Sequence, residues 1–286
     1  MSGKSTAFSE NRILNCRGKV LDLKEPKIMG ILNLTPDSFY DGGQNLKDDF
    51  FLVKAKELIN EGAAILDIGA ASTKPGSRII DQAEEWKQLE RPLKLLRKEY
   101  PEIIISIDTY HSTTAQQAAD YGAEMINDIS GGTIDAQIFD VVAKNKMAYV
   151  LMHIQGTPEN MQQNPVEGNV LNGINSFFEK QLELLTDAGV KHILLDPGFG
   201  FGKTLDQNYQ LLNGLEQFKH FNWPILVGLS RKSMIFKYLE MDPQKALNGT
   251  TVLNTLALLN GVSVLRVHDA LEARETISLF LKYKQF

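Results

Sequence analysis

Seven stretches of the chain place polar residues directly after short apolar segments. Three of these stretches supply carboxylate or amide side chains, namely Asp108, Asn127 and Asp196. Together the three offer oxygen acceptors, and the amide of Asn127 adds a donor. A carboxylate can accept two parallel hydrogen bonds, which suits a flat heterocycle that carries ring N–H and amino groups. Each residue could instead cap a helix, because Asp and Asn are preferred N-cap residues.

Two later stretches carry positive charge that suits an anion. Residues 230–233 read Ser-Arg-Lys-Ser, and residues 266–269 read Arg-Val-His-Asp. Arg offers a planar fork to phosphate and Lys a point charge. Arg266 and His268 are two residues apart in a predicted strand, so they point to the same side. A surface ion pair between Arg266 and Asp269 is the alternative.

Two loops are rich in turn residues and hydroxyl groups. Residues 33–43 contain Thr35, Pro36 and Phe39, and residues 72–77 contain Pro75 followed by glycine. Such composition suits mobile loops that close over a substrate. Ordinary surface turns have the same composition, so the pattern alone leaves both interpretations open.

The elements that must position these residues alternate along the chain as strand and helix. Short apolar runs predict eight buried parallel strands, at residues 28–33, 65–68, 103–107, 125–127, 148–152, 193–195, 225–227 and 264–267. Amphipathic stretches predict helices at residues 46–61, 82–98, 113–121, 135–145, 173–188, 206–215, 243–260 and 271–283. This order favours an α/β fold, a (β/α)8 TIM barrel, whose chemistry lies at the carboxyl ends of the strands. An open doubly wound sheet is the competing architecture, but its site would lie at one switch point only.

The segment before the first barrel strand predicts a β-hairpin. Two apolar runs flank the Arg17-Gly18-Lys19 turn, and we expect this hairpin to cover the bottom of the barrel. We expect residues 1–12 to form a disordered tail and residues 13–286 to form a single barrel domain.

Composition and charge limit the classes of function. The chain has 286 residues, of which 43% are hydrophobic and 23% charged, and its net charge is −5. This net negative charge disfavours nonspecific binding to nucleic acid. Cys16 is the single cysteine, so no disulfide framework can form within the chain. No apolar run is long enough for a signal peptide or a membrane span, and we expect a cytoplasmic protein.

Several of these stretches resemble the motifs of dihydropteroate synthases. Residues 31–39 (ILNLTPDSF) and 72–76 (STKPG) resemble the first two signatures of that family. Residues 196–201 (DPGFGF), 230–233 (SRKS) and 266–269 (RVHD) match further motifs in the family order. The resemblance runs from about Ile13 to the C-terminus. It implies a transferase that joins 6-hydroxymethyl-7,8-dihydropterin diphosphate to 4-aminobenzoate and so makes dihydropteroate for folate synthesis. In this family, sulfonamides compete for the aminobenzoate site.

The resemblance also implies roles for individual residues. The pterin would be bound by Asp108, Asn127, Ile129, Met152, Asp196, Phe201 and Lys232. The diphosphate would be bound by Asn33, Arg266 and His268, with Asn33 also a ligand of Mg2+. The 4-aminobenzoate would lie against Phe39, Thr73, Pro75 and Ser233. Asp108, Lys232 and Asn33 would be catalytic, in an SN1-like loss of diphosphate during which Asp108 stabilises the cation. The family also implies a homodimer.

Two departures from the family pattern affect the aminobenzoate loop. Lys74 stands where arginine is usual, and Ala70 and Ala71 stand where a glycine and an acidic residue are usual. Lysine cannot make the fork contact of arginine. Two other functions remain open: a methyltetrahydrofolate:corrinoid methyltransferase, which would not need the Arg266 and His268 pair, and a pterin-binding paralogue without turnover, which would lack Lys232 or Asp108.

Overall fold

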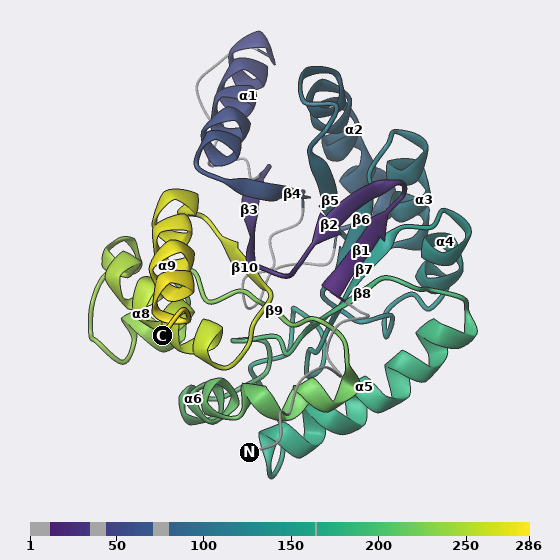
Figure 1. Ribbon diagram of the computed structural model, residues 1–286. Coiled ribbons are helices and arrows are strands. Elements are labelled where there is room, and N and C mark those ends of the chain that lie inside the picture. Colours follow the sequence, from purple (N-terminus) through teal and green to yellow (C-terminus); the bar gives the residue numbers. More distant parts are fainter. Residues whose placement is uncertain (1–11, 35–43, 71–79, 164) are drawn as a thin grey trace.

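Short segments rich in Ile, Leu and Val form eight parallel strands, and helices surround them in the computed structural model (Figure 1). The structure describes residues 12–34, 44–70, 80–163 and 165–286. The strands of the barrel are β3 (Lys27–Asn33), β4 (Ala63–Gly69), β5 (Ile104–Asp108), β6 (Met125–Asp128), β7 (Ala148–Met152), β8 (Ile193–Asp196), β9 (Leu226–Val227) and β10 (Val264–Val267). Each lies within two residues of the range predicted for it.

The eight strands close into a barrel. They follow the order β8-β7-β6-β5-β4-β3-β10-β9, and every neighbouring pair is parallel. Closure occurs where Leu195 of β8 bridges Ile225, directly before β9, and the amide of Leu195 donates to the carbonyl of Pro224 at 2.9 Å. The predicted (β/α)8 barrel is confirmed, and the open doubly wound sheet is excluded. All strand carboxyl ends therefore meet at one rim.

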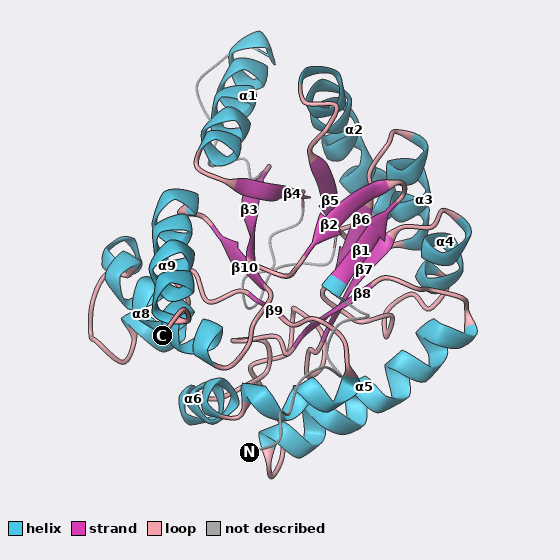
Figure 2. Cartoon of the chain, in the orientation of Figure 1, coloured by secondary structure: helices cyan, strands magenta, loops and turns pink. Residues whose placement is uncertain are grey.

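Helices follow the strands and pack on the outside of the barrel (Figure 2). The α-helices are α1 (Gln44–Asn60), α2 (Gln82–Glu99), α3 (Ser112–Asp120), α4 (Ile138–Lys144), α5 (Val170–Asp187), α6 (Leu205–Asn213), α7 (Ser233–Phe236), α8 (Leu247–Leu259) and α9 (Ala270–Tyr283). Two short 3-10 segments, η3 (Leu215–Phe221) and η4 (Pro243–Lys245), also occur in the described part of the chain. None of the helices within the described residues has the length and apolar character that a membrane crossing requires.

Some helix starts differ from the prediction for local reasons. Helix α4 begins at Ile138 rather than at Asp135, because the Asp135 carboxylate accepts the amides of Ser112 and Gln137 instead of entering the helix. Helix α5 begins earlier than predicted, where the Asn169 side chain accepts two amides of the first turn. Such side-chain capture of orphan amides is the usual way a helix start is fixed.

The predicted hairpin is present at the amino ends of the barrel strands. Strands β1 (Ile13–Cys16) and β2 (Lys19–Asp22) pair antiparallel. Leu14, Cys16 and Leu21 pack against a layer of inward-facing residues near the strand starts, such as Met29 and Ile65. The hairpin therefore closes the bottom of the barrel, as expected. The tail predicted for residues 1–12 lies, apart from Arg12, outside the described residues.

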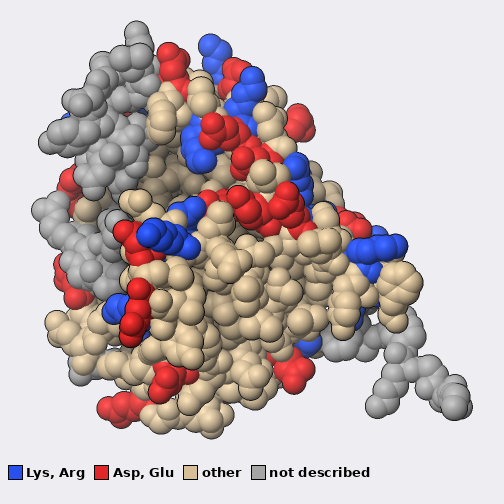
Figure 3. Space-filling model, turned by 90° about the vertical axis from the view of Figure 1, so that its left-hand side faces the viewer, with Lys and Arg blue, Asp and Glu red and all other residues tan. Residues whose placement is uncertain are grey.

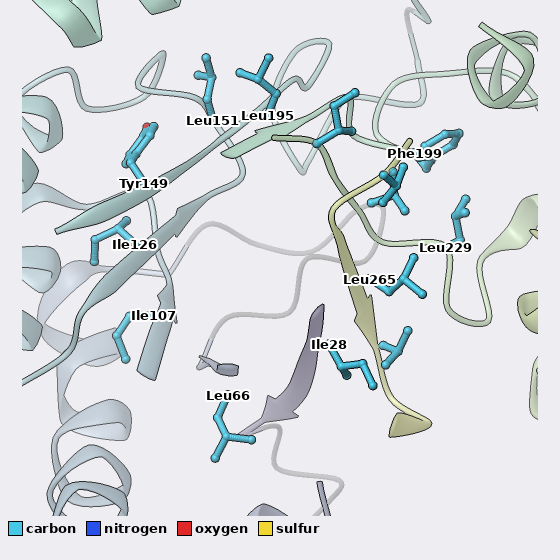
Figure 4. Packing of buried hydrophobic residues seen from close by; sticks show 14 of the residues in the cluster. Ile28, Leu66, Ile107, Ile126, Tyr149, Leu151, Leu195, Phe199, Leu229 and Leu265 are labelled. Atoms are coloured by element: carbon cyan, nitrogen blue, oxygen red, sulfur yellow. The ribbon is translucent and has the colours of Figure 1, made fainter. Parts of the chain in front are cut away.

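Alternate residues of each strand face opposite sides of the sheet. On β4, Leu66 and Ile68 belong to the large cluster that packs the strands on the helices, whereas Ile65 belongs to the inner layer. Figure 4 shows Leu66 and residues of other strands in this outer cluster, among them Ile107 and Leu265. The inner positions near the carboxyl ends are polar instead, and they form the mouth.

Candidate active site

The rim of the barrel brings the predicted polar residues together. Asp108 ends β5 and lies in register with Asn127 of β6, and Asp196 ends β8. Arg266 of β10 and Asn33 at the end of β3 come from the other side of the ring. None of the three acidic or amide residues is the N-cap of the helix that follows it, since those positions are His111, Gln137 and Thr204. The helix-capping interpretation was therefore wrong.

Asp67 lies at the centre of this arrangement, although the sequence did not single it out. Its Oδ2 accepts the Nε of Arg266 at 2.7 Å and the Nδ2 of Asn127 at 2.9 Å. The Nη2 of Arg266 donates to Asp108 Oδ2 at 2.9 Å. Four strands are thus joined by charged or amide groups inside the barrel. Because Asp67 is fully buried, water cannot screen these contacts.

Burial sets the protonation state of this cluster. Desolvation raises the pKa of Asp108 to about 8, although the Arg266 charge opposes the rise, and the nearby Asp67 adds to it. Burial alone would lower the pKa of Arg266, but Asp67 and Asp108 raise it. The arginine is therefore a fixed cation, whereas Asp108 can change its charge near neutral pH.

A second charged pair lies across the mouth. Desolvation raises the pKa of Asp196, and the Lys232 charge opposes this most strongly. Lys232 donates to the carbonyl of Phe199, and its Nζ lies 4.5 Å from the centre of the Phe201 ring. Burial lowers the pKa of Lys232 to about 8. The amide of Gly198 donates to Asp196 Oδ1 at 2.8 Å, which leaves further lone pairs on this carboxylate.

An apolar wall borders these polar groups. Ile129 and Met152, both predicted to line the site, form a buried cluster with Tyr110, and Phe201 packs against it. The same cluster contains Ile154 from the segment after β7. A flat ring between this wall and the carboxylates would have apolar contacts on its faces and acceptors at its edge.

The loops after β9 and β10 are fastened to each other. Arg231 makes two hydrogen bonds to Asp269, Nε to Oδ2 at 2.9 Å and Nη2 to Oδ1 at 2.7 Å. Ser230 Oγ lies 3.0 Å from His268 Nδ1. The predicted alternative of an Arg266–Asp269 surface pair was wrong, because Arg231 takes that carboxylate. His268 is exposed at the rim of the barrel.

Asn33 is the one predicted metal ligand. Its side chain is exposed at the end of β3, next to Gly69 of β4. Among the described residues, no group of three His, Cys, Asp or Glu side chains could hold a metal. A single amide oxygen fits Mg2+ that takes its remaining ligands from phosphate and water.

The predicted aminobenzoate site is described only in part. Ser233 begins α7 directly after Lys232 and is half-buried. Phe39, Thr73 and Pro75 lie outside the described residues, so their predicted roles stay predictions. Ala70 is buried at the end of the described part of that loop.

The period of the strand could have revealed Asp67. In β4, Ile65, Asp67 and Gly69 share one face, and Ile65 belongs to the inner layer. A carboxylate two residues after an inward-facing isoleucine must also point into the barrel. The prediction started from clusters of polar residues at strand ends, and Asp67 stands alone between the apolar residues Leu66 and Ile68.

A closed (β/α)8 barrel with acceptors, the basic side chains of Arg266 and Lys232 and an apolar wall at its mouth defines an enzyme for a small planar substrate with an anionic group. The family model described as pterin binding enzyme matches residues 29–268. The dihydropteroate synthase of Escherichia coli (strain K12) is 39% identical over 266 residues, which cover 92% of this chain and 94% of that protein.

Solved structures agree with this relationship. The dihydropteroate synthase of Yersinia pestis, in a sulfonamide drug complex, superposes with a TM-score of 0.89 at 38% identity and covers 96% of this chain and 100% of its own. The Clostridium difficile enzyme, solved in the presence of pteroic acid, gives a TM-score of 0.86 at 37% identity and covers 92% of this chain and 98% of its own. The chain belongs to the dihydropteroate synthase family of pterin-binding transferases.

Proposed function

We propose that the mouth of this barrel condenses (7,8-dihydropterin-6-yl)methyl diphosphate with 4-aminobenzoate, by the SN1-like route described below. Family membership supports the overall reaction. The observation that carries the assignment of roles is the convergence of Asp67, Asp108, Asn127 and Arg266 inside one mouth, opposite Asp196 and Lys232.

The pterin edge fits the acceptors of the mouth. A pterin carries an amino group beside a ring N–H, and the Asp196 carboxylate can accept both. Asn127 Oδ1 is buried and has no hydrogen-bond partner among the described residues. A buried acceptor without a partner costs about 1–3 kcal/mol, so a ring N–H that reaches it would bind favourably. Ile129, Met152 and Phe201 would contact the faces of the ring.

The diphosphate fits the polar side chains of Asn33, Arg266 and His268 on the other side of the mouth. Arg266 and His268 lie on β10 and directly after it, and Asn33 ends the neighbouring β3. Nε and Nη2 of Arg266 are bound to carboxylates, so this arginine reaches a phosphate only through its remaining donors. Mg2+ held by Asn33 would neutralise charge on the departing diphosphate.

The reaction begins with loss of the leaving group. The C–O bond to the methylene carbon breaks, and its electron pair leaves with the diphosphate. The carbon is left cationic and conjugated with the pterin ring. Asp108 faces this charge in its ionised form, which a nearby cation favours because an opposite charge lowers the pKa of a carboxyl group. Lys232, when protonated, carries positive charge beside the ring and would help to hold the departing diphosphate.

The aminobenzoate then attacks through its free lone pair. The new C–N bond forms, and the arylamine nitrogen loses a proton to water or to the released diphosphate. Ser233 would place the aminobenzoate together with Phe39, Thr73 and Pro75. Exclusion of water matters at this step, because water would otherwise capture the cation.

Diphosphate release tests this function directly. Purified protein is incubated with the pterin diphosphate, with and without Mg2+ and with and without 4-aminobenzoate. We expect release that requires Mg2+ and produces dihydropteroate in equal amount when 4-aminobenzoate is present. A protein that binds the pterin but releases no diphosphate under any of these conditions would be a paralogue without turnover.

We also propose a homodimer and a cytoplasmic location. The face of α8 and α9 supports the first, because Val252, Leu256 and Leu279 are exposed there. Figure 3 shows a broad area without charged residues on this side of the molecule. The buried free thiol of Cys16 is compatible with a reducing compartment.

A further inference from the structure

Lys203 is a buried lysine that the reaction described above does not use. It follows the glycine-rich loop after β8 and is 3% exposed. Its Nζ lies 2.7 Å from the carbonyl oxygen of Gly198, 3.0 Å from that of Phe201 and 3.0 Å from Nδ1 of His153. Two carbonyl oxygens and one ring nitrogen thus lie within hydrogen-bond distance of this nitrogen, and a lysine Nζ can donate to both carbonyls.

The loop of residues 198–201 curves around the Nζ of Lys203. The carbonyls of residues 198 and 201 point inward to the same nitrogen, and Gly198 and Gly200 adopt left-handed φ angles of 69° and 83°. At Gly198 a Cβ atom would lie 1.9 Å from the carbonyl oxygen of His153. Glycine is therefore required there, and the loop lies close against the segment after β7.

Further contacts join the two segments on either side of Lys203. The Nε2 of Gln162 donates to the carbonyl of Gly200 at 2.7 Å, and the amide of Val166 donates to the carbonyl of Gly202 at 3.0 Å. The outer side of the same loop forms the wall of the mouth. It presents the Phe201 ring and the Phe199 carbonyl to Lys232, and its Gly198 amide to Asp196.

We infer that Lys203 is a positioning residue for pterin binding: its Nζ holds residues 198–201 in the curve that places Phe201 and orients Asp196. Substrate cannot reach Lys203, so it acts only through this loop. The inference rests on the proposed function, because it assigns the loop to the pterin wall. Residues 198–201 are not among those proposed to bind the aminobenzoate or the diphosphate.

The test compares ligand affinities in Lys203→Met. Methionine keeps a chain of similar length but offers no donor, so two carbonyls and the His153 nitrogen lose their partner. We expect the Kd for 6-hydroxymethylpterin, which lacks diphosphate and is followed by its fluorescence, to rise at least tenfold. The KM for 4-aminobenzoate should change less than threefold. Lys180→Met, at an exposed position of α5, is the control and should leave both values unchanged.

A second variant covers the case in which Lys203→Met does not fold. His153→Leu removes one of the three acceptors and leaves both carbonyls, and we expect a rise of about threefold in the same Kd. A purely structural role would lower the melting temperature of the variants and leave the Kd of the folded protein within a factor of 1.5 of the wild type. That result in Lys203→Met, or in His153→Leu if the first variant is unfolded, overturns the inference. A wild-type protein that binds no pterin would instead contradict the proposed function.

Discussion

Two carboxylates share one arginine at the base of the mouth, and their different hydrogen bonds indicate a different role for each. Asp67 accepts from both Arg266 and Asn127, whereas Asp108 accepts only from Arg266 among the described residues. Asp67 therefore fixes the positions of two neighbours, and Asp108 remains the group nearer to the rim. We assign the structural part of this cluster to Asp67 and the chemical part to Asp108.

Removal of Asp67 should be far more costly than removal of a surface carboxylate. In Asp67→Ala the Arg266 cation keeps only Asp108 as a charged partner, and breaking a buried ion pair costs about 3–5 kcal/mol. Glu57→Ala is the control, because it removes the carboxylate paired with Lys54 on the surface of α1, where both side chains are about half-exposed. Exposed pairs contribute about 1 kcal/mol or less. Urea unfolding of both variants measures the difference, and equal losses would contradict a central role for Asp67.

Asp108 should make stability depend on pH. Its pKa is raised from 3.8 to about 8, mainly by desolvation, so the folded state disfavours the ionised form. Stability is then fully present below the ordinary carboxyl pKa and is lost as the pH rises toward 8, with a slope of up to about 1.4 kcal/mol per pH unit. Asp108→Asn lacks this titration, so its stability relative to the wild type should grow from pH 5 to pH 8.

Urea unfolding at several pH values measures the difference in stability between the two proteins. A difference that does not change with pH would exclude a raised pKa for Asp108.

Asp108→Asn should also retain affinity for the pterin and lose turnover, because the amide cannot balance the charge of the pterin cation. Unchanged turnover in Asp108→Asn would remove Asp108 from the mechanism.

At the scale of elements, the two ends of the barrel differ in the side chains that close or line them. The hairpin of β1 and β2 closes the bottom with apolar side chains, whereas the polar residues lie at the carboxyl ends of the strands. The loops after β7 and β8 are fastened by Lys203, and those after β9 and β10 by Arg231 and Asp269. Each half of the mouth thus has its own bridge between neighbouring loops.

The separation predicts a variant that loses stability and keeps its function. Leu14 is 1% exposed in the hairpin, and Leu14→Ala should cost about 2–5 kcal/mol. The pterin Kd of the folded variant should stay within twofold of the wild type, because the hairpin lies at the opposite end of the strands. Val20→Ala, at a residue 67% exposed in the same hairpin, is the control and should change neither quantity appreciably. A weakened pterin Kd in Leu14→Ala would show that the two ends are coupled.

Elements could be predicted from the sequence better than contacts could. The strands are short apolar runs buried on both faces, so all eight were found to within two residues. The short α7 and η3 were missed, because four to seven residues are too few to show a helical period. The hydrogen-bond partners of Arg266 and Arg231 could not be predicted, because they depend on which of several carboxylates lies nearest after the barrel closes. The roles predicted for Phe39, Thr73 and Pro75 stay predictions.

At the scale of the molecule, α8 and α9 present an unusual amount of apolar surface. Val252, Leu256 and Leu259 follow one another at helical spacing on α8, with exposed fractions of 51%, 42% and 51%. On α9, Leu279 and Tyr283 are 73% and 67% exposed, and a groove of about 440 Å3 lies between the two helices. Glu272 and Glu275 also line this groove, and exposed apolar surface edged by polar residues is typical of an interface between protein chains. The face lies on the side of the barrel rather than at the mouth, so a second copy could cover it without closing the site.

This face predicts how the protein associates in solution. Size-exclusion chromatography with light scattering should give twice the chain mass of 32.0 kDa for the wild type. Leu279→Glu places a charge in the apolar face and should shift the protein to the monomer or weaken the dimer at least tenfold, because an unpaired charge is costly to bury. Val20→Glu adds the same charge to an exposed valine of the hairpin and should leave the mass unchanged. A wild-type monomer, or a dimer that persists in Leu279→Glu, would mean that this face is not the interface. If Leu279→Glu is a monomer, its rate of diphosphate release shows whether one barrel is active alone.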